Sequence, residues 1–115
     1  MQYLLMLYVN QAGWSKLTPA EQEQGVAAYS AYTGALTKAG VLKGSNRLQP
    51  TTAATTARMA NGKAQVLDGP YADSKEQLGG YYLIDVPDLD AAISWAARCP
   101  AASHGVVEVR PVWVM

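Results

Sequence analysis

Three side chains in this 115-residue sequence could move protons or bind an anion. Asp68 precedes Gly69-Pro70, so a turn could hold its carboxylate at the mouth of a pocket as a general acid or base. His104 is the only histidine, and an imidazole titrates near neutral pH, which suits proton transfer. Arg110 could hold a carboxylate or phenolate through its planar fork of donors. Together they predict proton transfer, elimination or isomerisation on a small acidic or phenolic molecule, without a cofactor.

Each of these residues also has a purely structural interpretation. Asp68 could accept backbone hydrogen bonds within its own turn, and a lone loop histidine is more often only solvated. Glu108 and Arg110 lie two residues apart, hence about 7 Å apart on one face of a strand, where they could form an ion pair. Asp73 and Glu76 have the spacing of N-cap and N3 in a short helical turn. Both interpretations stay open at this stage.

Tyrosines and a lysine could line the same pocket. Tyr8, Tyr29 and Tyr81 combine an aromatic ring with a hydroxyl, which suits a small ring compound and equally suits core or dimer packing. Lys75 lies in a polar segment before a strand and could face the pocket or remain solvated. The sequence has no local catalytic-triad motif, phosphate loop or dinucleotide fingerprint. We therefore expect no bound cofactor.

Composition excludes several classes of protein. Nine basic residues balance nine acidic residues, so no net field attracts nucleic acid or an anionic membrane surface. With Cys99 the only cysteine and a single histidine, neither an internal disulfide nor a zinc or iron centre is expected. The sequence shows no signal-peptide pattern and no apolar stretch as long as a membrane span. We expect one domain over residues 1–115, located in the cytoplasm.

The elements that must position these residues follow from apolar patterning and turn residues. Residues 3–9 are apolar on both alternating faces, which predicts a central strand. Thr18, Pro19 and Glu21 form a capping box that starts a helix over residues 18–39. The residues predicted on its inner stripe are Val26, Tyr29, Thr33 and Leu36, and Gly40 is predicted to end it in a left-handed conformation.

A strand is predicted at residues 41–49, and four more strands are predicted in the rest of the chain. Asn61-Gly62 marks a type I′ hairpin, and residues 79–86 form the next strand. Asp88 caps a second helix, which ends at Pro100. Its predicted inner face is Leu89, Ala92, Ile93 and Ala96. A last strand spans 105–114, where Pro111 favours a sheet edge or a bulge.

The order β-α-β-β-β-β-α-β matches an α+β, ferredoxin-like (split βαβ) antiparallel sheet with two helices on one face. Because the strands carry apolar residues on both sides, the second face must also be covered. An identical sheet from a second copy is the simplest cover, which predicts a homodimer.

The segment LDGPYADSKEQLGGYYLIDVPDLDAAISWAARCPAASHGVVEVRPV closely resembles the YCII-related family, in the branch named for an Asp-Gly-Pro-Phe motif. Tyr71 replaces the Phe, which keeps the ring and adds a hydroxyl. The resemblance extends upstream through YLLMLYV, LTPAEQ and AGVLKGSNRLQP. It implies a dimeric, α/β-barrel-like assembly, a cleft near the dimer interface, and an association of this branch with extracytoplasmic-function sigma factors.

The proposed active site of the family's founding branch is a His-Asp pair whose histidine lies on the first helix. Here residues 18–39 contain no histidine, so that pair does not transfer to this chain. Two functions of different class remain. One is a cofactor-independent lyase or isomerase with Asp68 and His104 as acid and base, and the other is a non-catalytic metabolite-binding or regulatory module that contacts a sigma factor.

Overall fold

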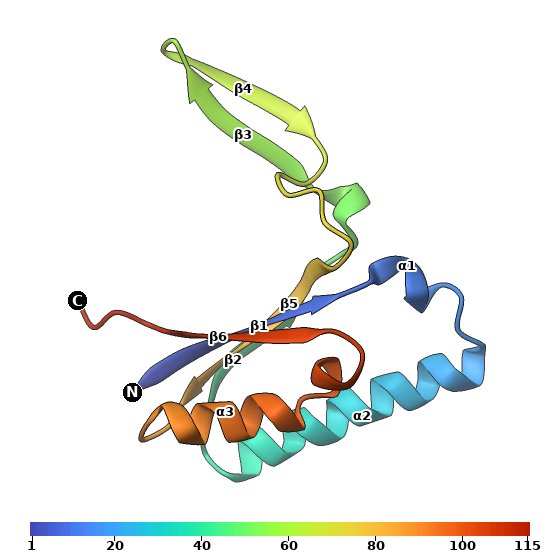
Figure 1. The fold of residues 1–115 in the computed structure, drawn as a ribbon, viewed down its shortest axis with the longest axis vertical. Coiled ribbons are helices and arrows are strands. Elements are labelled where there is room, and N and C mark those ends of the chain that lie inside the picture. The colour runs from blue at the N-terminus through green and yellow to red at the C-terminus, as the bar shows by residue number, and fades with distance from the viewer.

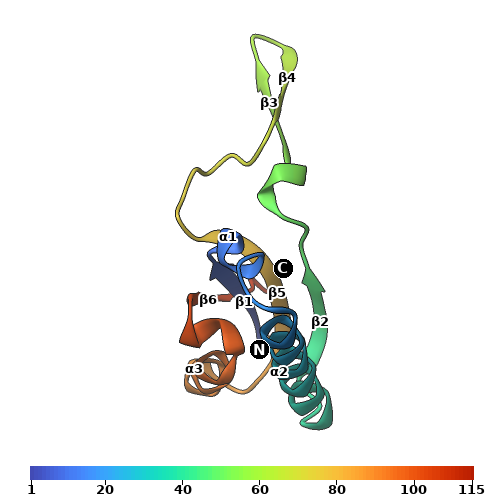
Figure 2. The same cartoon turned by 90° about the vertical axis from the view of Figure 1, so that its right-hand side faces the viewer.

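A four-stranded antiparallel sheet carries two helices on one face, and a two-stranded hairpin stands apart from it (Figures 1 and 2). The computed structural model describes all 115 residues. The strand order is β2-β5-β1-β6. The strands are β1 (Gln2–Val9), β2 (Leu42–Arg47), β3 (Thr55–Ala60), β4 (Lys63–Asp68), β5 (Gln77–Asp85) and β6 (Val106–Pro111), and the helices are α1 (Gln11–Trp14), α2 (Pro19–Lys38) and α3 (Leu89–Arg98). The α+β class is thus confirmed, and the sheet order is consistent with a ferredoxin-like fold.

Strand β1 lies in the interior of the sheet, between β5 and β6, as its apolar pattern predicts. Tyr3, Leu5 and Leu7 point toward the helices and are buried. Leu4 and Met6, which alternate with them, are only partly buried on the opposite face. One face of the sheet is therefore covered by the protein's own helices, and the other is not.

Helix α2 begins and ends as predicted. Thr18 Oγ1 accepts a hydrogen bond from the Glu21 N–H at 3.2 Å, and Glu21 Oε1 accepts one from the Thr18 N–H at 3.0 Å. This reciprocal pair is the capping box. At the other end, Gly40 has φ +74°, and the Val41 N–H donates to the Leu36 carbonyl oxygen at 3.2 Å.

The inner faces of the two helices differ in part from the prediction. On α2, Leu36 is buried as expected, but Tyr32 replaces Val26 among the covered residues, and Val26 is 51% exposed. On α3, Ala92 and Ala96 are buried, whereas Leu89 and Ile93 are each 49% exposed. Alanine side chains are small and let a helix pack close to the sheet, so the larger Leu89 and Ile93 side chains lie at the border of the contact.

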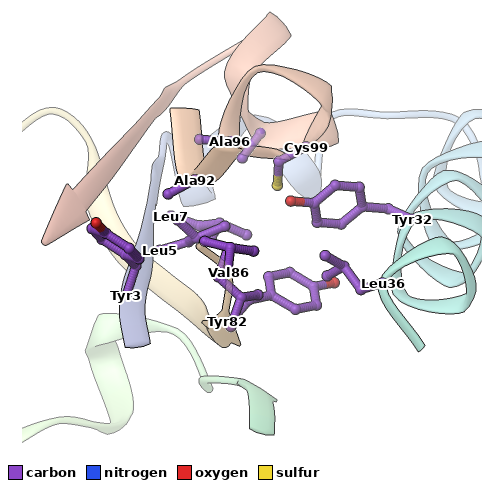
Figure 3. Packing of buried hydrophobic residues seen from close by; sticks show 12 residues of the cluster. Tyr3, Leu5, Leu7, Tyr32, Leu36, Tyr82, Val86, Ala92, Ala96 and Cys99 are labelled. Carbon is purple, nitrogen blue, oxygen red and sulfur yellow. The ribbon is translucent and has the colours of Figure 1, made fainter. Parts of the chain in front are cut away.

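The core is small for a chain of this length. Thirteen of 115 residues are buried, and only Leu5, Leu36 and Ile84 are large side chains with less than 2% exposure. Figure 3 shows the side chains of α2 meeting those of β1 and β5 between the sheet and the helices. Much of the apolar surface therefore lies outside this core.

The hairpin of β3 and β4 forms at the predicted turn. Asn61 and Gly62 have φ of +51° and +75°, which a type I′ turn requires at both central positions. No residue of either strand is buried. The two strands form a sheet of their own and do not join the four-stranded sheet.

The last strand is shorter than predicted and ends at Pro111. It lies at one edge of the sheet, which is the first of the two positions predicted for Pro111, because proline cannot donate to a further strand. None of the helices has both the length and the apolar content needed to cross a membrane.

Candidate functional site

The face of the sheet opposite the helices, which we call the uncovered face, has an apolar centre. Directly paired residues of an antiparallel sheet share a face, so the register places Leu83 beside Leu4 and Tyr81 beside Met6. All four are partly exposed. Helices α2 and α3 lie on the other side of the sheet (Figure 2). The uncovered face could therefore receive a second sheet or form the floor of a site for a flat ligand.

Polar side chains border this centre on both sides. On β6, Arg110 donates to Glu108, which confirms the predicted ion pair. Their side chains are 67% and 40% exposed, so the pair adds little to stability. On the side of β2, Asn46 Nδ2 donates to the Tyr81 hydroxyl at 2.8 Å. The Arg110 guanidinium has five N–H donors, so it keeps donors for an anion while it contacts Glu108.

A first hollow, of about 350 Å³, opens where the sheet meets the base of the hairpin. Tyr8 and Leu78, which are paired in the β1–β5 register, belong to its lining. The rest of its lining is Leu48, Gln49, Thr51, Ala54, Pro70, Ala72, Ser74 and Gln77. This volume and mixed lining suit a small ring compound with one or two polar groups.

Two glutamines hold the walls of the first hollow in place. Gln77 Oε1 accepts a hydrogen bond from the Gln11 N–H at 3.1 Å, and Gln11 Oε1 accepts one from the Thr51 N–H at 3.1 Å. Gln77 Nε2 donates to the Ser74 carbonyl oxygen at 2.7 Å. These bonds tie α1 to the segments before β3 and β5. These bonds could not be predicted from the sequence, because glutamines in loops carry no diagnostic spacing.

Asp68 ends β4, and its carboxylate accepts no hydrogen bond. The turn is held by other groups instead. Gly69, with φ +115°, donates its N–H to the Ala54 carbonyl oxygen at 2.7 Å, and Thr56 Oγ1 donates to the Gly69 carbonyl oxygen at 2.7 Å. Asp68 therefore does not accept backbone hydrogen bonds in its own turn, which was the structural role considered for it. Its carboxylate is exposed and available to a ligand.

A second hollow, of about 390 Å³, lies beside this turn on the hairpin. It is lined by Thr56, Arg58, Gln65, Leu67 and residues 68–71, and the Arg58 guanidinium carbon lies 5.8 Å from the centre of the Tyr71 ring. Pro70 lines both hollows, so the two are adjacent.

The loop that follows, residues 70–76, contains no helical turn. The predicted capping pair of Asp73 and Glu76 is therefore wrong. Ser74 Oγ donates to the Glu76 carbonyl oxygen instead, and this local bond shapes the loop without a helix.

His104 is exposed in the connection before β6, and its Nδ1 lies 3.3 Å from Ser103 Oγ. The next residue, Gly105, is pressed against β1, since a Cβ there would lie 2.2 Å from the Tyr8 carbonyl oxygen. His104 is therefore held near the end of β1 at which Tyr8 lines the first hollow. It does not itself line either hollow.

Two other predicted residues lie away from the hollows. Tyr29 packs beside the core on the helix side of the sheet, and burial raises its pKa to about 12, with a further rise from nearby Cys99 and Tyr82. Its hydroxyl is therefore neutral near pH 7. Lys75 is exposed in the loop before β5.

The single chain thus brings only some of the predicted residues together. Tyr8 and Asp68 border adjacent hollows, Tyr81 and Arg110 share the uncovered face, and His104, Tyr29 and Lys75 lie outside both hollows. No group of three or more His, Cys, Asp or Glu side chains is placed to hold a metal ion. The groups that remain can bind an anion through a guanidinium and exchange protons through a carboxylate or an imidazole.

Comparison with known proteins agrees with this fold and sequence pattern. The family model described as the YCII-related domain matches residues 1–115. An uncharacterized protein of Rhizobium meliloti (strain 1021) is 40% identical over 114 residues, which cover 97% of this chain and 92% of that protein. The chain belongs to the YCII-related family.

Proposed function

We propose that this YCII-related protein acts as a homodimer that binds a small acidic or phenolic molecule between its two sheets. The observation that carries the proposal is the size of its surface. The chain exposes 8037 Å², whereas a compact monomer of 12.3 kDa would expose about 6,100 Å². Its radius of gyration is 16.1 Å, against about 13 Å for a compact domain of this length. A partner surface would remove this excess.

The uncovered face supports the sheet as the contact surface. Its centre is apolar, and its polar pairs lie toward β6 and β2, as in an interface with an apolar middle and a polar rim. A second sheet at about 10 Å would turn the open hollow beside Tyr8 into an enclosed one. Tyr81 would supply a hydroxyl and Arg110 a cation to a bound carboxylate or phenolate.

The chemistry proposed for this site is cofactor-independent acid/base catalysis, as in a lyase or an isomerase. Asp68 or His104 would take a proton from a carbon next to a carbonyl, and the other would return a proton to the product. Arg110 would stabilise the negative charge that develops on oxygen. Such chemistry requires only a base, an acid and an anion contact, which are the groups that the chain offers.

Deuterium exchange tests this function without knowledge of the product. Small carboxylates and phenols that raise the melting temperature would be incubated with the protein in D₂O, and their C–H signals followed by proton NMR. We expect exchange with the wild type and its loss in Asp68→Asn and His104→Gln. Asp73→Asn, an exposed carboxylate outside both hollows, is the matched control and should exchange normally. Equal exchange in all four proteins would remove Asp68 and His104 from the mechanism.

One observation favours a non-catalytic alternative. Asp68 and His104 are both exposed, and neither the first nor the second hollow contains both. The same dimer could therefore sense a metabolite and contact an extracytoplasmic-function sigma factor, as the family resemblance suggests. Ligand-dependent capture of such a factor, together with no deuterium exchange across the panel, would support this alternative over catalysis.

A further inference from the structure

The β3–β4 hairpin is amphipathic. Paired residues share a face and successive pairs alternate, so the register places Ala57 with Val66 and Met59 with Ala64 on one face, which we call the apolar face of the hairpin. The opposite face carries Thr56, Arg58, Ala60, Lys63, Gln65 and Leu67 and is mostly polar. An alternation of this kind is typical of a sheet with one side covered.

Nothing in the chain covers the apolar face. Met59 is 68% exposed and Val66 is 62% exposed, and Ala57 and Ala64 are also exposed. The hydrogen bonds around Gly69 run to Ala54 and Thr56, so they close the base of the hairpin on itself. A hairpin of two strands is marginally stable in water by itself. Its apolar face therefore needs a partner surface.

The direction of the hairpin indicates where that partner lies. The helices α2 and α3 are on one side of the sheet, and the hairpin rises on the other side in both views (Figures 1 and 2). A second copy stacked on the uncovered face would lie on the same side as the hairpin. Each strand of the hairpin has six residues and so spans about 20 Å, enough to pass a second sheet at about 10 Å and reach the helices behind it.

We propose that the hairpin is an arm that packs its apolar face, Ala57, Met59, Ala64 and Val66, against the flank of a second copy of this chain. This inference rests on the proposed homodimer. In addition to the contact between the two sheets, the arm of each copy would contact the other copy. Asp68 ends the arm at its base, in register with Thr55 on the apolar face. Pro70 of the Asp68 turn lines the first hollow, so the base of the arm lies at the rim of the hollow that the second copy would complete.

The size of the excess surface favours a second copy of the chain over a small partner. The excess surface is about 1,900 Å² per chain, or roughly 3,800 Å² for two, as judged against a compact monomer of this mass. Obligate homodimers bury about 2,000–5,000 Å² in total. In a two-fold symmetric dimer, each arm packs its own apolar face against the other copy. The basic residues Arg58 and Lys63 then remain on the solvent side.

Charge substitutions on the two faces of the hairpin test the arm. Val66→Asp places a carboxylate on the apolar face, and Gln65→Asp places one on the neighbouring polar position of the same strand. We expect Val66→Asp to weaken dimerisation at least tenfold in sedimentation velocity and Gln65→Asp to leave it within twofold. Val66 is already exposed in the single chain, so the fold should survive, as circular dichroism would verify.

A fluorescent label provides an independent readout. Cys99 is the only cysteine and is 2% exposed, so a cysteine added at Met59 would be labelled selectively with a polarity-sensitive dye. Emission should shift to the blue as the concentration rises through the dimerisation range for Met59→Cys, and not for Gln65→Cys. A wild-type dimer with no such shift and no effect of Val66→Asp would overturn the arm and leave the stacked sheets standing. A wild-type monomer would overturn both.

Discussion

Tyrosine rings fill much of the contact between α2 and the sheet. The rings of Tyr32 and Tyr82 meet edge to face, with centroids 5.2 Å apart. Tyr32 donates its hydroxyl to the Trp95 carbonyl oxygen at 2.8 Å, and the Tyr82 hydroxyl lies 2.8 Å from Thr33 Oγ1. Burial raises the pKa of both phenols, as it does for Tyr29. The folded chain therefore holds these phenols in the neutral form.

This neutral form makes stability sensitive to alkaline pH. An unfolded tyrosine has a pKa of about 10, and the pKa of Tyr29 is about 12 in the folded chain. Because the folded-state value is raised, the contribution to stability is complete below pH 10 and is lost as the pH rises toward 12. We expect the melting temperature followed by circular dichroism to fall steeply between pH 10 and pH 12.

Tyr82→Phe provides the control for that titration. It removes one buried phenol and keeps the ring, so its melting temperature should fall less than that of the wild type between pH 10 and pH 12. An equal fall in both proteins would mean that groups other than the buried tyrosines control the alkaline transition.

Helix and strand ends were predictable from the sequence because they depend on local chemistry. The capping box at Thr18, the left-handed Gly40 and the turn at Asn61-Gly62 each need only a few adjacent residues, and all three are confirmed. The inward face of α3 was predicted less well. Leu89 and Ile93 fit an apolar stripe, but the sheet leaves room for alanines there, and that spacing is set by residues far away in the chain.

Two glycines test how closely the elements pack. A Cβ at Gly105 would lie 2.2 Å from the Tyr8 carbonyl oxygen, so Gly105→Ala should lower the free energy of unfolding by about 1–3 kcal/mol. Gly34 lies within α2 with no atom within 4 Å of an added Cβ, so Gly34→Ala should raise it by about 0.5–1 kcal/mol. Urea denaturation would measure both. Destabilisation by Gly34→Ala, or none by Gly105→Ala, would contradict the packing described.

The candidate site could be predicted only in part, because its residues meet through pairing across the sheet and through long connections. The ion pair of Glu108 and Arg110 follows from a spacing of two on one strand and is confirmed. The contact between Asn46 and Tyr81 depends on the register of β2 with β5, which no local pattern specifies. Whether Asp68 and His104 act together stays a prediction, since it depends on a second chain.

At the scale of the whole molecule, much of the apolar surface of the chain lies outside its core. Its extents of 48 × 45 × 18 Å describe a thin plate with an arm, and both the uncovered face and the hairpin lie on the side away from the helices. A second copy on that side would cover both surfaces at once. The proposed site and the proposed arm thus depend on the same assembly.

A charge at the centre of the uncovered face should therefore disrupt that assembly. Leu83 lies beside Leu4 on this face and pairs with Gly44 on its other side, so Leu83→Arg would bury an unpaired cation between two sheets, and we expect a monomer in size-exclusion chromatography. Ala31→Arg adds the same charge on the exposed side of α2 and should leave the dimer intact. Dimers of equal affinity in both variants would show that the sheets do not meet through this face.

The most direct test of the dimer is the mass of the wild-type protein in solution. Sedimentation equilibrium at micromolar concentration should give twice the chain mass of 12.3 kDa. A mass of 12.3 kDa throughout the micromolar range would mean that the uncovered face stays open to water, and it would contradict the proposed site.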